Sequence, residues 1–492
     1  MSAWTVAAAS TAAVGTTAAI GTTAAVGTTA ATAPDAAVSF AEADALLRST
    51  VDLGAERAPG AGLERTLADY RRLGLPPGTL VGVGLPNGTD LLTHYFAIVL
   101  AGLVPLLAAP SSPPGRVAQL AGHLNMGAYV APERIVAKLG DGRTHRVGAR
   151  QLALLHRAEP HPERYRPGDV VMLTSGTSGI FSACMNRFDA LLRNARRHNL
   201  ATGVRPGDAV LVVLPLYYSY ALVAQALSAL AAGARLVIGR PPFRPDGYRA
   251  AITEHGIDVS SVTPALARQF TAQGAALPHR LRTLTVGGDQ LTERHVGELL
   301  ALHHGELYLT YGLTEAGPRV ATLAAHREPR AHWRSVGLPL PQVGVSLREV
   351  RPDGVGELVV ESDTVLSRKV GQVRSQPLLA PGRIATGDLF SMNAAGYLFF
   401  EGRLRDFVVV RGEKVSLFAM RQAAESLPGI ACARPQVSDG DGDPVVELVV
   451  YAADPSRTTA EAVRRQLGRL LMRGELPHRV SVLAADGLDF HK

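Results

Sequence analysis

Short apolar segments that alternate with helical patterns constrain the fold of this chain more than any other feature. Thr79–Leu85, Val104–Pro110 and Ala209–Leu214 each have the composition of a strand that ends at a turn, and helix-like segments lie between them. Parallel strands need such long crossovers, whereas antiparallel strands can be joined by tight turns. The alternation therefore predicts an α/β fold with a largely parallel sheet that is covered by helices.

One of these strands leads into a run of only Thr, Ser and Gly. Val170–Leu173 is apolar, and Thr174–Gly179 follows it directly. The two glycines of the run permit positive φ, and the small side chains let successive backbone N–H groups surround a phosphate. The same composition also suits a polar surface turn, so the run alone is compatible with both interpretations. It is not the common P-loop, because no Gly-Lys-Ser/Thr closes it.

Length and charge narrow the class of protein. A chain of 492 residues exceeds one compact core, so we expect two or three domains. Two cysteines cannot build a disulfide scaffold, which predicts a cytoplasmic location. A net charge of +7 without a long basic run does not indicate nucleic-acid binding, although it could attract a polyanion such as ATP.

Residues 1–35 are low-complexity, and their Thr and Gly interrupt any apolar run, so we expect a flexible tail and no membrane span.

Other predicted strands end at segments that carry candidate functional side chains. Pro215–Tyr220 contains three tyrosines, Gly287–Asp289 follows a second strand, and Tyr311–Glu315 follows a third. Ligands of open α/β sheets bind beyond the carboxyl ends of strands, so these segments are candidates for a site. In Tyr311–Glu315 an aromatic ring offers a flat face for a purine, and Thr and Glu supply the oxygen ligands that Mg²⁺ accepts. Each segment could instead be an ordinary strand end or loop.

These segments, together with Thr386–Asp388, Gly402–Arg403 and Gly412, occur in the order and at about the spacing typical of one family. From about residue 79 to residue 492 the chain resembles the adenylate-forming superfamily, which includes acyl-CoA synthetases, nonribosomal-peptide adenylation domains and luciferases. The resemblance implies a large N-terminal domain, residues 36–402, of stacked mixed sheets with helices and a small β-barrel-like part. A small, mobile α+β C-terminal domain, residues 403–492, would follow it.

The resemblance also implies a reaction and its participants. A carboxylic acid would react with ATP in the presence of Mg²⁺ to give an acyl-adenylate, and CoA or a phosphopantetheinyl carrier protein would accept the acyl group. The residues implied to bind the nucleotide are Thr174, Ser175, Gly176, Thr177, Ser178, Gly179, Gly288, Asp289, Tyr311, Gly312, Asp388 and Arg403. The residues implied to line the acid pocket are Tyr217, Tyr218, Tyr220, Gly287 and Leu313. Catalytic roles fall to Thr314, Glu315 (also the Mg²⁺ ligand), Arg403 and Lys492, with Arg405 at the hinge and Gly412 beside the thiol tunnel.

Departures from the family pattern leave alternatives open. The usual Pro-Lys-Gly after the Thr/Ser/Gly run is replaced by Phe181-Ser182-Ala183, which removes a lysine, and Arg187 is a candidate substitute. Tyr217-Tyr218 stands where amino-acid-activating domains carry Phe-Asp, which favours an aryl or acyl acid without an α-ammonium group.

A thiol acceptor is favoured by Gly412, and the basic charge would suit an acidic acyl or peptidyl carrier protein. An amide-forming ligase and a degenerate nucleotide-binding partner without turnover are the two alternatives.

Overall fold

We describe a computed structural model of the chain, which covers residues 38–54, 61–139, 144–156, 161, 163–174, 182–373, 376–404, 407–410, 413–438, 444–471 and 475–485. Several residues with predicted roles lie outside this range, namely Ser175, Gly176, Thr177, Ser178, Gly179, Arg405, Gly412 and Lys492. Their roles stay predictions. Among the residues that the structure describes, no helix combines the length and the apolar character needed to cross a membrane.

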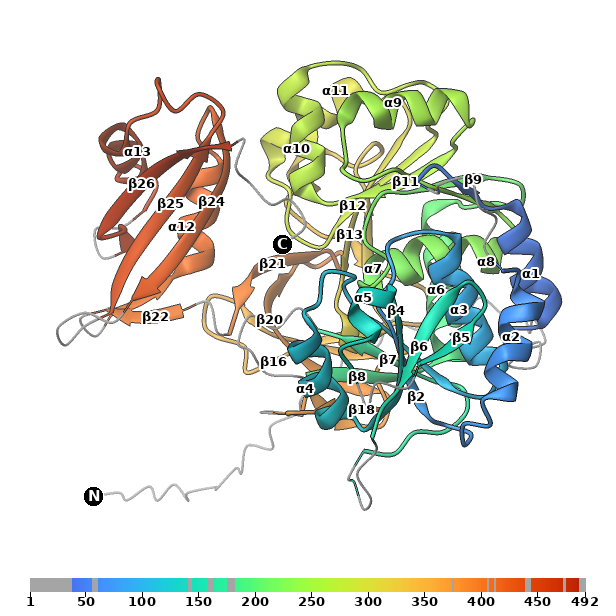
Figure 1. The fold of residues 1–492 in the computed structure, drawn as a ribbon. Coiled ribbons are helices and arrows are strands. Elements are labelled where there is room, and N and C mark those ends of the chain that lie inside the picture. The colour runs from blue at the N-terminus through green and yellow to red at the C-terminus, as the bar shows by residue number, and fades with distance from the viewer. Residues whose placement is uncertain are drawn as a thin grey trace, which may run out of the picture. The chain divides into compact units, whose positions relative to one another are not determined.

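The first eight-stranded sheet contains the strands that precede Pro215–Tyr220, Gly287–Asp289 and Tyr311–Glu315 (Figure 1). Its order is β1-β10-β9-β11-β12-β13-β14-β15, parallel as far as β13 and antiparallel beyond it. The strands are β1 (Val51–Asp52), β9 (Ala209–Val212), β10 (Arg235–Ile238), β11 (Val259–Val262), β12 (Thr283–Gly287), β13 (Glu306–Gly312), β14 (Arg319–Ala324) and β15 (Leu338–Pro339). Helices α9 (Pro245–Glu254), α10 (Pro264–Gln273) and α11 (Glu293–Leu302) connect successive parallel strands, as the alternation predicts.

The second eight-stranded sheet, in the order β18-β8-β7-β3-β2-β4-β6-β5, holds the strand before the Thr/Ser/Gly run. Its parallel centre is β2 (Leu80–Val83), β3 (Val104–Leu107), β4 (Met126–Ala131) and β7 (Asp169–Leu173). Its antiparallel edges are β5 (Thr144–Val147) and β6 (Arg150–Leu154) on one side, and β8 (Ser182–Arg187) and β18 (Arg368–Gly371) on the other.

Helices pack between and around these two sheets. They are α1 (Phe40–Ser49), α2 (Leu63–Arg72), α3 (Thr89–Leu100), α4 (Pro114–Leu124), α5 (Glu133–Val136), α6 (Phe188–Thr202), α7 (Ser219–Ala221), the π-helical turn η1 (Leu222–Leu227) and α8 (Ser228–Ala232). One hydrophobic cluster joins residues of α3 and α6 to strands of both sheets, with Phe96, Leu191, Val83 and Leu211 among its members. Burial of this shared apolar surface stabilises the stacked arrangement, which confirms the predicted α/β fold class.

The part that we expected to be β-barrel-like is a five-stranded antiparallel sheet. It consists of β16 (Gly344–Arg348), β17 (Gly356–Glu361), β19 (Leu378–Ala380), β20 (Arg383–Met392) and β21 (Leu398–Arg403). Short 3₁₀ turns η2 (Thr314–Ala316) and η3 (Arg330–His332) precede it.

The C-terminal elements have the α+β composition that we expected. They are β22 (Phe407–Val410), β23 (Glu413–Ser416), α12 (Leu417–Glu425), β24 (Ile430–Ser438), β25 (Val445–Ala452), α13 (Ala460–Leu467) and β26 (Arg479–Ala484). A separate hydrophobic cluster, which includes Met420, Leu448 and Leu467, forms their core.

Candidate functional site

The Tyr311–Glu315 segment turns sharply at the end of β13. A Cβ added to Gly312 would lie 2.1 Å from the carbonyl oxygen of Pro318, so only glycine fits this position. The next backbone N–H, that of Leu313, donates to the same oxygen at 2.9 Å. Sequence and turn together therefore fix where Thr314 and Glu315 begin the 3₁₀ turn η2.

Three residues with predicted nucleotide-binding roles meet beyond that strand end. The Tyr311 Oη donates to Asp388 Oδ2 at 2.7 Å, and the Arg403 Nε donates to Asp388 Oδ1 at 3.0 Å. Asp388 and Arg403 are opposite each other in the β20–β21 register. Burial raises the pKa of Asp388, while Arg403 and Tyr311 act in the other direction. Carboxylate oxygens can each accept more than one hydrogen bond, so this carboxylate could also accept from a vicinal diol.

Glu315 forms an ion pair that the sequence did not suggest. The Lys369 Nζ lies 2.5 Å from Glu315 Oε1, and the two side chains are 10% and 19% exposed. Lys369 belongs to β18 and faces Cys184 of β8 in the strand register. Burial alone would lower the pKa of Lys369, but Cys184 and Glu315 raise it overall. Only the pairing of β18 with β8 brings this lysine to the site, and no local motif marks it.

The carboxylate of Glu315 is suited to one mode of magnesium binding. Mg²⁺ in proteins is commonly held by one or two carboxylates together with substrate phosphates and water. Within the described ranges, no group of three or more His, Cys, Asp or Glu could hold a metal by itself. The residues therefore fit an ion that is shared between Glu315 and bound phosphates.

The strands on either side of the Thr/Ser/Gly run form a hairpin. In it β7 and β8 pair as far as Leu173 and Ala183, and the Thr174 Oγ1 lies 3.3 Å from the Ser182 Oγ. Gly371 of β18 pairs with Ser182, which places Lys369 near this end of the hairpin.

Arg187 does not replace the lysine that the family pattern has after the run. It ends the six-residue strand β8, about 17 Å along the strand from Ser182 at the usual rise per residue. Its guanidinium binds Asp169 Oδ1 at 3.1 Å, at the far end of the hairpin. The strand geometry thus rules out Arg187 as the substitute, because the chain moves away from the run before reaching it.

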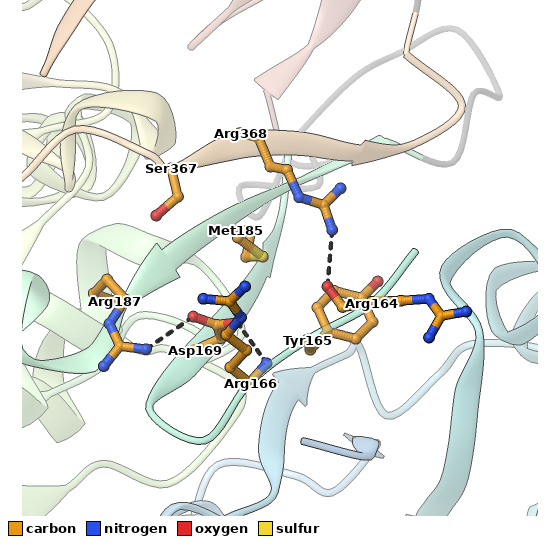
Figure 2. A pocket seen from close by; sticks show the side chains of 8 residues that line it. All are labelled: Arg164, Tyr165, Arg166, Asp169, Met185, Arg187, Ser367 and Arg368. Carbon is orange, nitrogen blue, oxygen red and sulfur yellow. Dashed lines mark hydrogen bonds and ion pairs between the residues drawn. The ribbon is translucent and has the colours of Figure 1, made fainter. Parts of the chain in front are cut away.

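A cavity of about 780 Å³ lies at that far end (Figure 2). Its lining consists of Arg164, Tyr165, Arg166, Asp169, Met185, Arg187, Ser367 and Arg368. Figure 2 shows Arg187 directed at Asp169, and Arg368 directed at the backbone of Arg164. Apart from Arg187, none of the residues with predicted roles is in this lining, so the cavity does not define the candidate site.

The tyrosine segment forms a wall beside the ends of β12 and β13. The rings of Tyr217 and Tyr218 lie 4.6 Å apart between centroids, tilted by 50°. The Tyr220 Oη is 2.9 Å from Thr285 Oγ1 of β12. A Cβ added to Gly287 would lie 3.2 Å from Tyr220 Cζ and 2.4 Å from Thr310 Oγ1, so glycine is needed there for packing.

The remaining predicted residues have other neighbours. The Thr314 Oγ1 lies 2.9 Å from the Ser219 Oγ, which ties η2 to the tyrosine segment. Gly288 has φ +92°, a conformation that favours glycine. Asp289 accepts from Arg421 of α12 at 2.9 and 3.1 Å, so this exposed carboxylate is held by an arginine rather than by the Tyr311–Asp388–Arg403 cluster.

The chain is similar to a known family and to several known proteins. Residues 67–368 match the family described as AMP-binding enzyme. The chain is 25% identical to a salicylyl-CoA synthase / salicylate adenylyltransferase of a Streptomyces species, over 83% of this chain and 82% of that protein. It is 26% identical to the salicyl-AMP ligase / salicyl-S-ArCP synthetase of Mycobacterium tuberculosis, over 80% and 75% of the two chains.

A solved structure shares the fold. The o-succinylbenzoate CoA synthetase of Bacillus subtilis, in complex with its acyl-adenylate intermediate, superposes with a TM-score of 0.74 at 17% identity. The match covers 89% of this chain and 94% of that one. The matched family spans more than half of the present sequence, and the chain belongs to the AMP-binding enzyme family of adenylate-forming enzymes.

Proposed function

We propose that the protein activates a carboxylic acid with ATP and then transfers the acyl group to a thiol. The observation that carries this proposal is the convergence of Tyr311, Asp388 and Arg403 beyond the end of β13, with Glu315 in the next turn. Two relatives that the chain matches over most of their length are named as a salicylate adenylyltransferase and a salicyl-AMP ligase, which supports the same reaction class.

In the first step the substrate carboxylate oxygen attacks the α-phosphorus of ATP, and the bond to the pyrophosphate leaving group breaks. The protein supplies position and charge rather than covalent chemistry. Tyr311 would flank the adenine, and Asp388 would accept from the ribose hydroxyls. Glu315 would hold Mg²⁺, which neutralises phosphate charge when bound. We propose that Lys369 also helps to neutralise the phosphate charge, since its ammonium group lies against the Glu315 carboxylate.

In the second step a thiolate attacks the acyl carbon of the adenylate, the tetrahedral centre collapses, and AMP leaves with the phosphate oxygen. CoA or a phosphopantetheinyl carrier protein is the proposed thiol, and the net charge of +7 would favour an acidic carrier. Gly412 beside the thiol path, Arg405 at the hinge and Lys492 as the catalytic cation stay predictions.

The acid is proposed to be aryl or acyl without an α-ammonium group. Tyr217 and Tyr218 offer aromatic surface where a pairing carboxylate would be needed for an amino acid. Aromatic surface of this kind suits an apolar or aromatic substrate body.

Acid-dependent exchange of pyrophosphate into ATP tests the first step across aryl, short-chain, long-chain and amino acids. We expect exchange with one aryl or acyl class, and a loss of at least about 100-fold in Asp388→Asn, because one preorganised partner of the nucleotide is removed. Asp353→Asn, in the exposed turn after β16, is the matched control. If ATP binds but no acid supports exchange, the protein is a nucleotide-binding partner without turnover. If an added amine accepts the acyl group faster than CoA or a carrier thiol, the thiol proposal fails.

A further inference from the structure

A buried arginine that has no counter-ion among the described residues lies beside the proposed acid pocket. Arg319 begins β14 and is 2% exposed. Its Nε and Nη2 atoms are buried and have no hydrogen-bond partner, and Tyr220 is the only described residue that interacts with its charge favourably. A buried guanidinium in this state is strongly unfavourable, so its retention points to a ligand that completes it.

The backbone of Arg319 is fixed in place. Its N–H donates to Asn194 Oδ1 at 2.8 Å, and its carbonyl oxygen accepts from Asn194 Nδ2 at 2.9 Å. Asn194 belongs to α6 and is fully buried. Arg319 is also directly opposite Gly312 in the β13–β14 register. The cation is thus attached to the same strand pair that presents Tyr311 and Glu315.

The guanidinium lies over the ring of Tyr220, a residue proposed to line the acid pocket. Its Cζ lies 4.7 Å from the ring centroid of Tyr220, and that ring packs against Gly287. The other ionisable group close to it is His198 of α6, which carries no negative charge in any protonation state. Neither neighbour neutralises the arginine, and an aromatic face compensates only part of a buried charge.

We infer that Arg319 binds a second anionic group of the substrate, so that the acid activated by this protein is a dianion. A guanidinium pairs with a carboxylate in a planar, bidentate geometry, which makes an additional carboxylate the best fit. This inference rests on the proposed function, because it names the substrate class of the same pocket. One carboxylate would react with ATP while the other pairs with Arg319.

The test compares matched acids on the full chain. Benzoate is measured against the three benzenedicarboxylates, and pentanoate against pentanedioate, by the kcat/KM of acid-dependent ATP–pyrophosphate exchange. We expect the wild type to prefer a diacid, and Arg319→Met to lower that preference by about 100-fold, the usual scale for truncating one partner of a buried charge pair. Arg319→Lys, which keeps the charge, should retain part of the preference.

Thermal unfolding without ligand separates a ligand-directed arginine from a structural one. Replacing an uncompensated buried charge with an apolar side chain of similar length should raise the Tm by about 3 °C. Arg197 is the matched control, because it is buried on α6 but binds Asp363 at 2.6 Å and Gln342 at 2.7 Å. Arg197→Met should lower the Tm and leave the ratio of diacid to monoacid activity unchanged.

Three results would overturn the inference: a wild type that prefers monoacids, an Arg319→Met variant that loses both acid types equally, or a fall in its Tm like that of Arg197→Met. Failure of the proposed function looks different, since the wild type would then show no exchange with any acid. In that case, a diacid that raises the Tm of the wild type but not of Arg319→Met still supports the binding site, and no such shift overturns it.

Discussion

At the scale of single residues, the Lys369–Glu315 pair is the least exposed charge pair of the candidate site. Lys369→Met should lower the free energy of unfolding by about 3 kcal/mol, because it leaves a largely buried carboxylate without its cation. Urea unfolding measures this. The double variant Lys369→Met/Glu315→Gln should lose less than the sum of the single variants, since the two side chains share one interaction. Additive losses would show that the pair contributes nothing as a pair.

Gly287 offers a second test at this scale. Gly287→Ala should lower acid-dependent exchange by about 10-fold, because the added methyl group collides with Thr310 and displaces the Tyr220 ring. The kcat/KM for the preferred acid is the measurement. Gly122→Ala is the control, since nothing lies within 4 Å of its added Cβ in the helix α4. That control should leave exchange intact and add about 0.5 kcal/mol of stability. Equal exchange in both variants would contradict the packing argument.

Candidate residues that lie in one short motif could be found from the sequence. Residues that reach the site only because distant strands pair could not. Tyr311 and Glu315 belong to one five-residue segment whose chemistry is visible in the sequence alone. Lys369 reaches Glu315 only because β18 pairs with β8, and Arg319 is isolated because no carboxylate in the described part of the chain reaches it. Charge compensation is a property of the folded neighbourhood, so a sequence pattern does not reveal it.

At the scale of elements, helix α6 ties the two sheets to the site. Asn194→Leu should lower the free energy of unfolding by about 2 to 4 kcal/mol, because the backbone N–H and carbonyl of Arg319 lose their buried partners. Equilibrium unfolding in urea provides the measurement. Leu200→Ala lies on the same helix with a side chain that is 77% exposed, and should change stability by less than about 0.5 kcal/mol. Similar losses of stability in the two variants would show that the hydrogen bonds between Asn194 and the Arg319 backbone do not stabilise the fold.

The order of strands and helices along the chain could be predicted, because the spacing of apolar residues indicates which residues are buried. The pairing of the edge strands could not be predicted. The parallel centres follow from strands separated by helices. The antiparallel edge of β8 and β18 joins residues about 185 positions apart, such as Cys184 and Lys369, and nothing local specifies that pairing. It is this edge that decides which cation reaches Glu315. The Arg187 hypothesis failed for the same reason, since it assumed proximity in sequence where the strand carries the side chain away.

At the scale of the whole molecule, buried histidines should set the acid limit of stability. Burial lowers their pKa from 6.5 to about 4 or about 3 in His94, His198, His295 and His303. The unfolded chain therefore takes up protons first, and stability that is complete above pH 6.5 falls as the pH drops toward those values. Each histidine contributes up to about 1.4 kcal/mol per pH unit in that window.

Urea unfolding at pH 7.5, 6 and 5 measures this loss. His198→Asn should reduce the pH dependence, whereas His145→Asn, on an exposed strand, should not. A free energy of unfolding that stays constant from pH 7.5 to 5 would contradict the prediction.

The hydrophobic clusters predict that the chain can be divided. The C-terminal elements have their own core, and none of the other three clusters contains a residue beyond Phe400. A chain that ends at Leu404 should therefore unfold cooperatively and bind ATP through Tyr311, Asp388 and Arg403. It should lose pyrophosphate exchange, because the proposed catalytic Lys492 is removed.

The stability of the shortened chain should fall only modestly. Truncation removes the Phe400–Phe418 ring contact at 4.8 Å, the Arg421–Asp289 pair and the Arg268–Glu425 pair at 3.9 Å, which together are worth about 1 to 3 kcal/mol. Calorimetry of ATP binding, thermal unfolding and exchange are measured on the same preparation, with Lys492→Ala in the full chain as the control for lost catalysis. If the shortened chain folds and still exchanges pyrophosphate, the large domain carries the first step alone and Lys492 is not its catalytic cation. If it does not fold, the C-terminal core is required by the whole, and the boundary at residue 403 is wrong.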